Sequence, residues 1–146
     1  MSGDQAHFAA TVSAFVAALG DRVLPGIDSF SALFHEDATI EVPFDGSGDG
    51  APIVGKAAID DMVGSLAGFL WFDAVTFHSI RATDEPSVVV CEYEAVLRRA
   101  DMSGPRRRRY ISVITFRDGL ISRLLEYGGP FVPVDRLAAE AEPGRV

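Results

Sequence analysis

The sequence predicts an α+β fold in which helices lie on one face of a curved, mainly antiparallel sheet. Helical spacing of apolar residues dominates the first half of the chain, whereas alternation of apolar and polar residues dominates the second half. Short turns join the alternating segments, so consecutive strands should pair with one another. The 146 residues fit one domain, residues 1–146, with a candidate flexible tail from about residue 131.

Three helices are expected before the main run of strands. Apolar residues recur every three or four positions over residues 4–20, 27–34 and 56–66. The turn-forming pair Pro25-Gly26 separates the first two of these segments, and the polar residues 35–37 close the second. The pattern therefore predicts three amphipathic helices.

Strands are expected at five places. A short half-buried strand is predicted just before Pro43, and a meander of four strands follows the third helix. The turn residues at 84–86, 102–105 and 118–119 separate the strands of this meander. The five predicted strands are residues 38–43, 75–80, 87–99, 107–117 and 120–127.

Composition excludes several classes of function. The chain carries 21 acidic and 13 basic residues, a net charge of −8, which argues against a protein that tracks nucleic-acid phosphates. No apolar run approaches the length that spans a bilayer, and we expect a cytoplasmic protein without a leader. A single cysteine, Cys91, excludes an intrachain disulfide and a cysteine-based zinc site. We expect no metal and no cofactor, and a small apolar or weakly polar molecule as the ligand.

Four motifs connect the chain to a known family. They are LFHEDATIEVP (33–43), GKAAI (55–59), RYISVITFRDGLI (109–121) and EY (126–127), in this order. Together they resemble the SnoaL-like branch of the nuclear-transport-factor-2-like (NTF2-like) superfamily over about residues 5 to 131. The resemblance implies a cone of three N-terminal helices over the curved sheet, with an apolar pocket inside. It also implies a homodimer, which we expect to form through the convex sheet face because Tyr93, Val113 and Val89 would otherwise be uncovered there.

The superfamily includes ketosteroid isomerase, which uses an Asp base and an oxyanion hole of a tyrosine and a protonated Asp. The resemblance puts Val42 at the place of the base, Phe15 near that of the tyrosine and Ser112 near that of the second Asp. Valine cannot abstract a proton and phenylalanine cannot donate to an oxyanion. Steroid isomerisation by that mechanism is therefore disfavoured, and these three residues become candidates for substrate binding.

Other members of the superfamily suggest a different set of carboxylates. Limonene-epoxide hydrolase holds water between two aspartates on separate strands, and Glu94 and Glu126 lie at comparable places here. Glu92 takes the place of that enzyme's arginine. A cyclase in the SnoaL-like branch uses an acidic residue late in the chain, and Glu126 is its nearest counterpart.

Two residues carry the chemical hypothesis. Glu126 shares a strand face with Leu124, and enclosure by apolar walls would raise its pKa and suit it to acid/base work; a solvated glutamate at a strand end is the alternative. Tyr110 shares its face with Ser112, so its hydroxyl could orient a ligand, although a core tyrosine with a hydroxyl at the rim would look the same.

Four further candidates are less determined. Alternation alone sends Glu92 and Glu94 to solvent, whereas the resemblance sends them inward, and both alternatives stay open. Arg108 should lie on the Tyr110 side of its strand, as part of a solvated basic arm or as an anion-binding group. His78 is a candidate base or a structural histidine, and Trp71 a candidate pocket wall.

We therefore expect a cofactor-independent enzyme of isomerase, cyclase, dehydratase or hydrolase type that acts by general acid/base chemistry. Glu126 would transfer the proton, Glu94 or Glu92 would assist, and Tyr110 would polarise a substrate oxygen. The alternative is a non-catalytic module of the same fold that binds a small ligand or dimerises. Candidate substrate-binding residues are Trp71, Phe15, Val42, Glu92, Ser112, Arg108 and His78.

Overall fold

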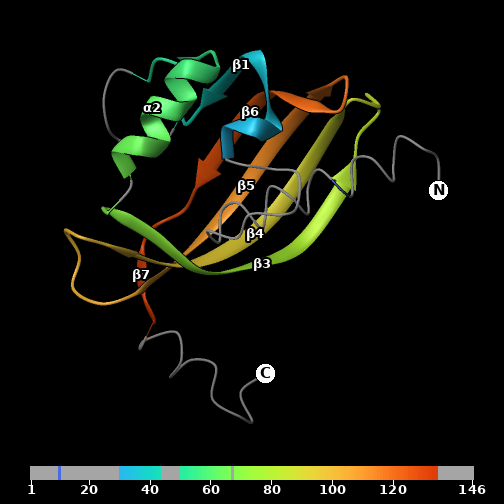
Figure 1. Ribbon diagram of the computed structural model, residues 1–146. Helices are drawn as coiled ribbons and strands as arrows, with labels where there is room; N and C mark the ends of the chain where they lie inside the picture. Colours follow the sequence, from blue (N-terminus) through green and yellow to red (C-terminus); the bar gives the residue numbers. More distant parts are fainter. Residues whose placement is uncertain (1–9, 11–29, 44–49, 67, 135–146) are drawn as a thin grey trace.

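The computed structural model describes residues 10, 30–43, 50–66 and 68–134. In this part of the chain seven strands form one curved, open sheet with the order β2-β1-β6-β5-β4-β3, and β7 pairs with β5 (Figure 1). The strands are β1 (Phe34–Glu41), β2 (Ile53–Val54), β3 (Leu70–Ala82), β4 (Val88–Arg99), β5 (Arg106–Arg117), β6 (Leu120–Gly128) and β7 (Val132–Pro133).

Strands β3 to β6 form the antiparallel meander that the sequence predicts. The β5–β6 turn has Asp118 and Gly119 at φ 52° and 81°, the left-handed conformation that a tight two-residue hairpin turn requires. Strand β1 pairs with β6 in parallel and with β2 in antiparallel fashion. The expectation of a mainly antiparallel sheet is therefore confirmed.

The helix α2 (Lys56–Leu66) has the bounds that the sequence predicts and lies beside β1 at one end of the sheet (Figure 1). Gly55 precedes it at φ 91° and donates its N–H to the Ala38 carbonyl at 2.8 Å, which ties the start of the helix to β1. Ile59 is fully buried and anchors the helix to the core. Of the expected helix at 4–20 the structure describes only Ala10, which is helical.

The expected second helix is wrong where it can be checked. Only Phe30–Leu33 is helical there, as the short 3-10 segment η1, and the chain is already in β1 at Phe34. Phe34 pairs with Ile121 of β6, and its ring packs against Phe30 with a centroid distance of 5.1 Å. This pairing with a distant strand outweighs the local helical spacing, and it also makes β1 begin earlier than the expected strand at residue 38.

Strand β3 also begins earlier than expected, at Leu70 instead of residue 75. The reason is again pairing, because Leu70, Trp71 and Phe72 face Arg99, Arg98 and Leu97 of β4. At the other end of the chain, Val132–Pro133 pairs with the start of β5, and residues after 134 lie outside the described part.

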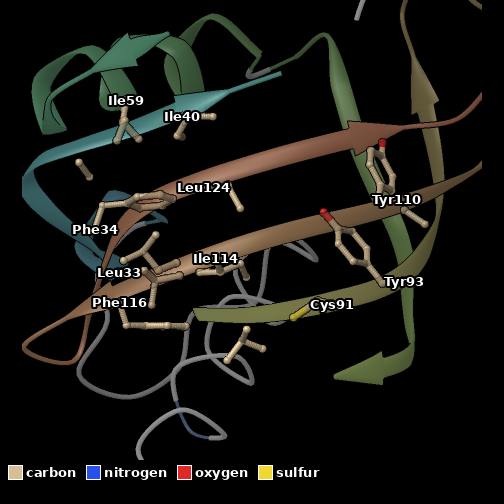
Figure 2. Packing of buried hydrophobic residues seen from close by; sticks show 14 of the residues in the cluster. Leu33, Phe34, Ile40, Ile59, Cys91, Tyr93, Tyr110, Ile114, Phe116 and Leu124 are labelled. Atoms are coloured by element: carbon tan, nitrogen blue, oxygen red, sulfur yellow. The ribbon is translucent and has the colours of Figure 1, made fainter. Parts of the chain in front are cut away.

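Buried side chains alternate along the central strands and define two faces. We call the face that carries Tyr93, Leu97 and Ile114 the inner face, and the opposite one the outer face. Figure 2 shows the core running from α2 and β1 to the two tyrosines of β4 and β5. Among the described residues, no helix combines the length and apolar character that a membrane span needs.

Candidate functional site

A polar group from three adjacent strands lies within the apolar inner face. Ser112 of β5 pairs with Cys91 of β4 on one side and with Glu126 of β6 on the other, and Tyr93 pairs with Tyr110. Directly opposed residues of antiparallel strands share a face, so these side chains all point inward. Tyr93 and Ser112 are 1% and 0% exposed, and we call Tyr93, Ser112 and Glu126 the inner triad.

The inner triad is linked by hydrogen bonds. The Tyr93 hydroxyl donates to Glu126 Oε1 at 3.0 Å and lies 3.2 Å from Ser112 Oγ. A phenol has one proton to donate, so Ser112 is the donor in the second bond. Two buried hydroxyls thus form a directed chain that ends on the Glu126 carboxylate.

Stacked rings hold the Tyr93 hydroxyl in place. Tyr93 lies between Phe77 of β3 and Tyr110 of β5, with centroid distances of 5.1 and 5.0 Å and interplanar angles of 16° and 13°. Figure 2 shows the rings of Tyr93 and Tyr110 side by side on neighbouring strands. This packing fixes the direction in which the phenol donates.

Three acidic side chains of this region, those of Glu126, Tyr110 and Tyr93, have raised pKa values. Loss of hydration raises the pKa of Glu126 above its ordinary 4.5, although the Tyr93 hydrogen bond and the charge of Arg108 oppose the rise. Burial and the nearby Glu126 charge raise the pKa of Tyr110 to about 12 and that of Tyr93 well above its ordinary value. Both phenols therefore stay protonated at neutral pH and act as hydrogen-bond donors.

Arg108 lies on the inner face beside Tyr110, as its position on the strand predicts. Its guanidinium carbon lies 4.4 Å from the Phe131 ring centroid and 5.0 Å from that of Tyr110, and Nε donates to the Gly129 carbonyl at 2.7 Å. Gly128 makes room for this arrangement, because a Cβ at that position would clash with the guanidinium.

The structure brings together four of the residues that the sequence singles out: Glu126, Tyr110, Ser112 and Arg108. Val42 follows β1 and packs against the core cluster. Phe15 lies outside the described residues.

Of the two alternatives left open for Glu92 and Glu94, the structure shows the outward one, which separates them from the role of assisting Glu126. Glu94 lies 3.5 Å from His78 and 3.8 Å from Arg107, and Glu92 accepts a hydrogen bond from Arg109 at 2.8 Å. All of these groups belong to the outer face, because the residues between the two glutamates and beside them on β4 are the buried ones. Charge pairing on the outer face thus fixes these carboxylates away from Glu126.

His78 and Trp71 also lie apart from the inner triad. His78 falls at an irregularity of the β3–β4 pairing between Phe77 and Ser79, where it faces Glu94. Trp71 pairs with Arg98 on the outer face, and the Arg98 guanidinium lies 5.5 Å from its ring centroid. Its neighbour Phe72 packs against the core instead, so Trp71 does not contribute to the inner face.

Tyr93 is the residue that the sequence analysis misses, and its expected outward direction is wrong, as is that of Val89, which is 5% exposed. The signal was present in the alternation along β4, since Cys91, Tyr93 and Ala95 form one apolar row. That pattern indicates an inward tyrosine and outward glutamates.

No group of three or more His, Cys, Asp and Glu side chains within the described ranges is arranged to hold a metal ion. Cys91 adjoins the inner triad through its pairing with Ser112, and burial raises the pKa of its thiol to about 11. A thiol with that pKa is protonated at neutral pH and is a poor nucleophile.

The curved sheet over which the inner triad lies agrees with the fold expected of the SnoaL-like branch of the NTF2-like superfamily. The SnoaL-like domain family matches residues 12–124, and the chain belongs to this family. This confirms the resemblance carried by the four sequence motifs.

Individual relatives agree with this assignment. The chain is 31% identical over 104 residues to the uncharacterized protein YesE of Bacillus subtilis (strain 168), covering 71% of each chain. A crystal structure of a Bacillus subtilis protein named as a proposed isomerase has 28% identity and a TM-score of 0.76, covering 88% of this chain and 91% of that one. An LEH-like epoxide hydrolase of Mycobacterium tuberculosis shares the fold, with 21% identity, a TM-score of 0.66, and coverage of 85% of this chain and 84% of that one.

Proposed function

We propose that this protein is an enzyme that transfers a proton to or from a small molecule, with Glu126 as the general acid or base. The observation that carries the proposal is the Glu126 carboxylate on the inner face, desolvated and bound at 3.0 Å by a buried phenol. A carboxyl group whose pKa is raised toward the working pH exchanges protons with substrate more effectively than a solvated one.

The neighbouring groups suit this role. Tyr93 orients the carboxylate and leaves its second oxygen for substrate, while Tyr110 is a phenol donor that can polarise a substrate oxygen. The names of similar proteins, an isomerase and an epoxide hydrolase, both denote reactions that move protons, which supports the same general chemistry here. Isomerase, cyclase, dehydratase and hydrolase reactions all remain within the proposal, in a cytoplasmic and cofactor-independent enzyme.

A non-catalytic module that binds a small ligand or dimerises is the second candidate, and the outer face favours dimerisation. Ile111 is 48% exposed there and adjoins Val113, which pairs with Val90 and Leu125. An apolar row of this kind on one sheet face suits a two-fold interface with a second copy of the chain. Homodimerisation is compatible with catalysis, so the two candidates differ only in what the inner face does.

The experiment uses 5-nitrobenzisoxazole as a general probe of proton abstraction. A base takes the proton from carbon, the electron pair of the C–H bond forms the nitrile, and the N–O bond breaks to release a coloured phenolate. We expect the wild type to catalyse this ring opening and Glu126→Gln to lower kcat/KM by about 10²-fold. Because the base must be ionised, the wild-type rate should rise with pH along a limb that lies above 4.5.

Glu94→Gln is the matched control, since it makes the same change on the outer face of the same sheet. We expect this variant to retain nearly full activity. Equal activity of Glu126→Gln and the wild type would remove Glu126 from the mechanism. Absence of any turnover above buffer, with ligand binding retained, would favour the binding module.

A further inference from the structure

The arginines of the described residues differ in how their charge is neutralised. Six of them lie within 4.0 Å of a carboxylate, in pairs whose members are Arg98–Asp73, Arg99–Asp101, Arg107–Glu94, Arg109–Glu92, Arg117–Asp37 and Arg123–Glu41. Arg81, Arg106 and Arg108 have no such partner among the described residues, and of these three Arg108 is the one that lies on the inner face beside the inner triad. Apart from its longer-range effect on Glu126, its positive charge is therefore available to a ligand.

Arg108 is held in place without being neutralised. Two aromatic rings, those of Phe131 and Tyr110, contact its guanidinium, and its Nε is bound to the Gly129 carbonyl at 2.7 Å. These contacts fix the plane of the group, and a hydrogen bond with the Tyr110 side chain adds to the one that Nε makes. The terminal nitrogens keep the fork geometry that matches a carboxylate in two parallel hydrogen bonds.

The nearby charges favour an anion. The Arg99 guanidinium also lies over the Phe131 ring, at 5.2 Å, but it is paired with Asp101 at 2.8 Å, so it competes only weakly for an anion. The Arg108 guanidinium lies against Gly128, which is two residues from Glu126 on the same face of β6, so an anion bound to Arg108 lies near the proposed acid/base group. When Glu126 is protonated, the positive charge of Arg108 is the uncompensated charge of this region.

We propose that Arg108 binds the carboxylate of a small organic acid, and that the substrate of the proton-transfer site is therefore an organic anion. The inference rests on the proposed function for what happens to the acid after binding, but the binding step stands by itself. It narrows the expected ligand, because an apolar or weakly polar molecule alone leaves the Arg108 charge unpaired.

Benzoate is the probe, with the isosteric neutral benzamide and inorganic phosphate as comparisons, each titrated by calorimetry at constant ionic strength. We expect wild-type protein to bind benzoate at least about tenfold more tightly than benzamide, as a charge-assisted bidentate pair implies. Arg108→Gln should lose about tenfold or more in benzoate affinity. Arg109→Gln, the next residue on the same strand but on the outer face, should bind benzoate as the wild type does.

Gly128→Ala is a second variant that keeps the charge and displaces the guanidinium, because the added methyl group clashes with it. We expect its benzoate affinity to fall while its circular dichroism spectrum stays that of the wild type. It guards against the possibility that Arg108→Gln loses affinity only through misfolding.

Several results would overturn the proposal: no benzoate binding to the wild type, equal affinity for benzamide, phosphate binding as tight as benzoate binding, or full benzoate affinity in Arg108→Gln.

Glu126→Gln separates this proposal from the proposed function. That variant should keep benzoate binding while losing proton abstraction, so retained turnover in Glu126→Gln would refute the function and leave the anion site standing. If Glu126→Gln loses turnover but the wild type does not prefer benzoate to benzamide, the proposed function stands and the anion site is refuted.

Discussion

Glu126 and Glu94 are the same amino acid on one sheet, yet the two faces of that sheet treat them in opposite ways. On the outer face Glu94 lies 3.5 Å from His78 and 3.8 Å from Arg107. On the inner face Glu126 is bound by the neutral phenol of Tyr93 and loses hydration, so that its pKa rises. Strand register therefore decides whether a carboxylate on this sheet meets basic side chains or neutral, buried hydroxyls.

The same contrast separates the neighbouring arginines of β5. Arg107 and Arg109 point outward and meet glutamates, whereas Arg108 points inward and meets rings and a backbone carbonyl. A run of basic residues on a strand is thereby divided into two structural charges and one charge available to a ligand.

The largest expected effect is on the free energy of unfolding, and it compares a buried residue of the inner face with an exposed residue of the outer face. Leu97 is fully buried on the inner face, and Leu97→Ala should lower the free energy of unfolding by about 2 to 5 kcal/mol through lost burial and the cavity left behind. Ile111→Ala, on the outer face, should change it by no more than about 0.5 kcal/mol when measured at dilute protein concentration. Urea unfolding of both variants is the measurement, and equal losses would contradict the assignment of faces.

A second effect concerns how stability depends on pH. In the folded protein Glu126 has a raised pKa, so between its ordinary value of 4.5 and the raised one the folded state binds more protons than the unfolded state. The contribution of this group to stability therefore falls as pH rises through that window. Glu126→Gln removes the fall, so its free energy of unfolding relative to the wild type should increase from pH 4 to pH 7. A difference that does not depend on pH would show that Glu126 is not desolvated.

The smallest effect is expected on the outer face. The Glu92 and Arg109 side chains are 40% and 64% exposed, and such a pair contributes at most about 1 kcal/mol. Glu92→Gln should therefore lower the free energy of unfolding by no more than that amount, and the loss should shrink in high salt because ions screen exposed pairs. A large, salt-independent loss would indicate that Glu92 is enclosed in the assembled protein.

Much of the fold follows from local pattern. The helix α2 has its predicted bounds, and β4, β5 and β6 each begin and end within one residue of the predicted strands, because tight turns mark their ends. The predicted strand starts are wrong where pairing with a strand distant in the sequence determines the structure. Phe34 enters β1 through its pairing with Ile121, and Leu70 enters β3 through its pairing with Arg99, and neither contact leaves a mark in the local sequence.

The candidate site could be predicted in part. Alternation on β5 and β6 places Arg108, Tyr110 and Glu126 inward as the structure has them. On β4 the alternation also indicates an inward Tyr93, but the resemblance to enzymes with paired carboxylates points to Glu94 instead. The hydrogen bond from Tyr93 to Glu126 joins residues 33 positions apart, and it depends on the side-by-side packing of three strands that no local pattern contains.

The central claim is that Glu126 is a desolvated carboxyl group held by Tyr93, and a carboxyl ¹³C NMR titration tests it most directly. Glu126→Gln assigns the resonance by its disappearance. The account predicts that the Glu126 pKa lies above 4.5 in the wild type and rises further in Tyr93→Phe, because that variant loses a hydrogen bond that favours the ionised form. A Glu126 pKa at or below 4.5 in the wild type, or one that falls in Tyr93→Phe, would contradict the account.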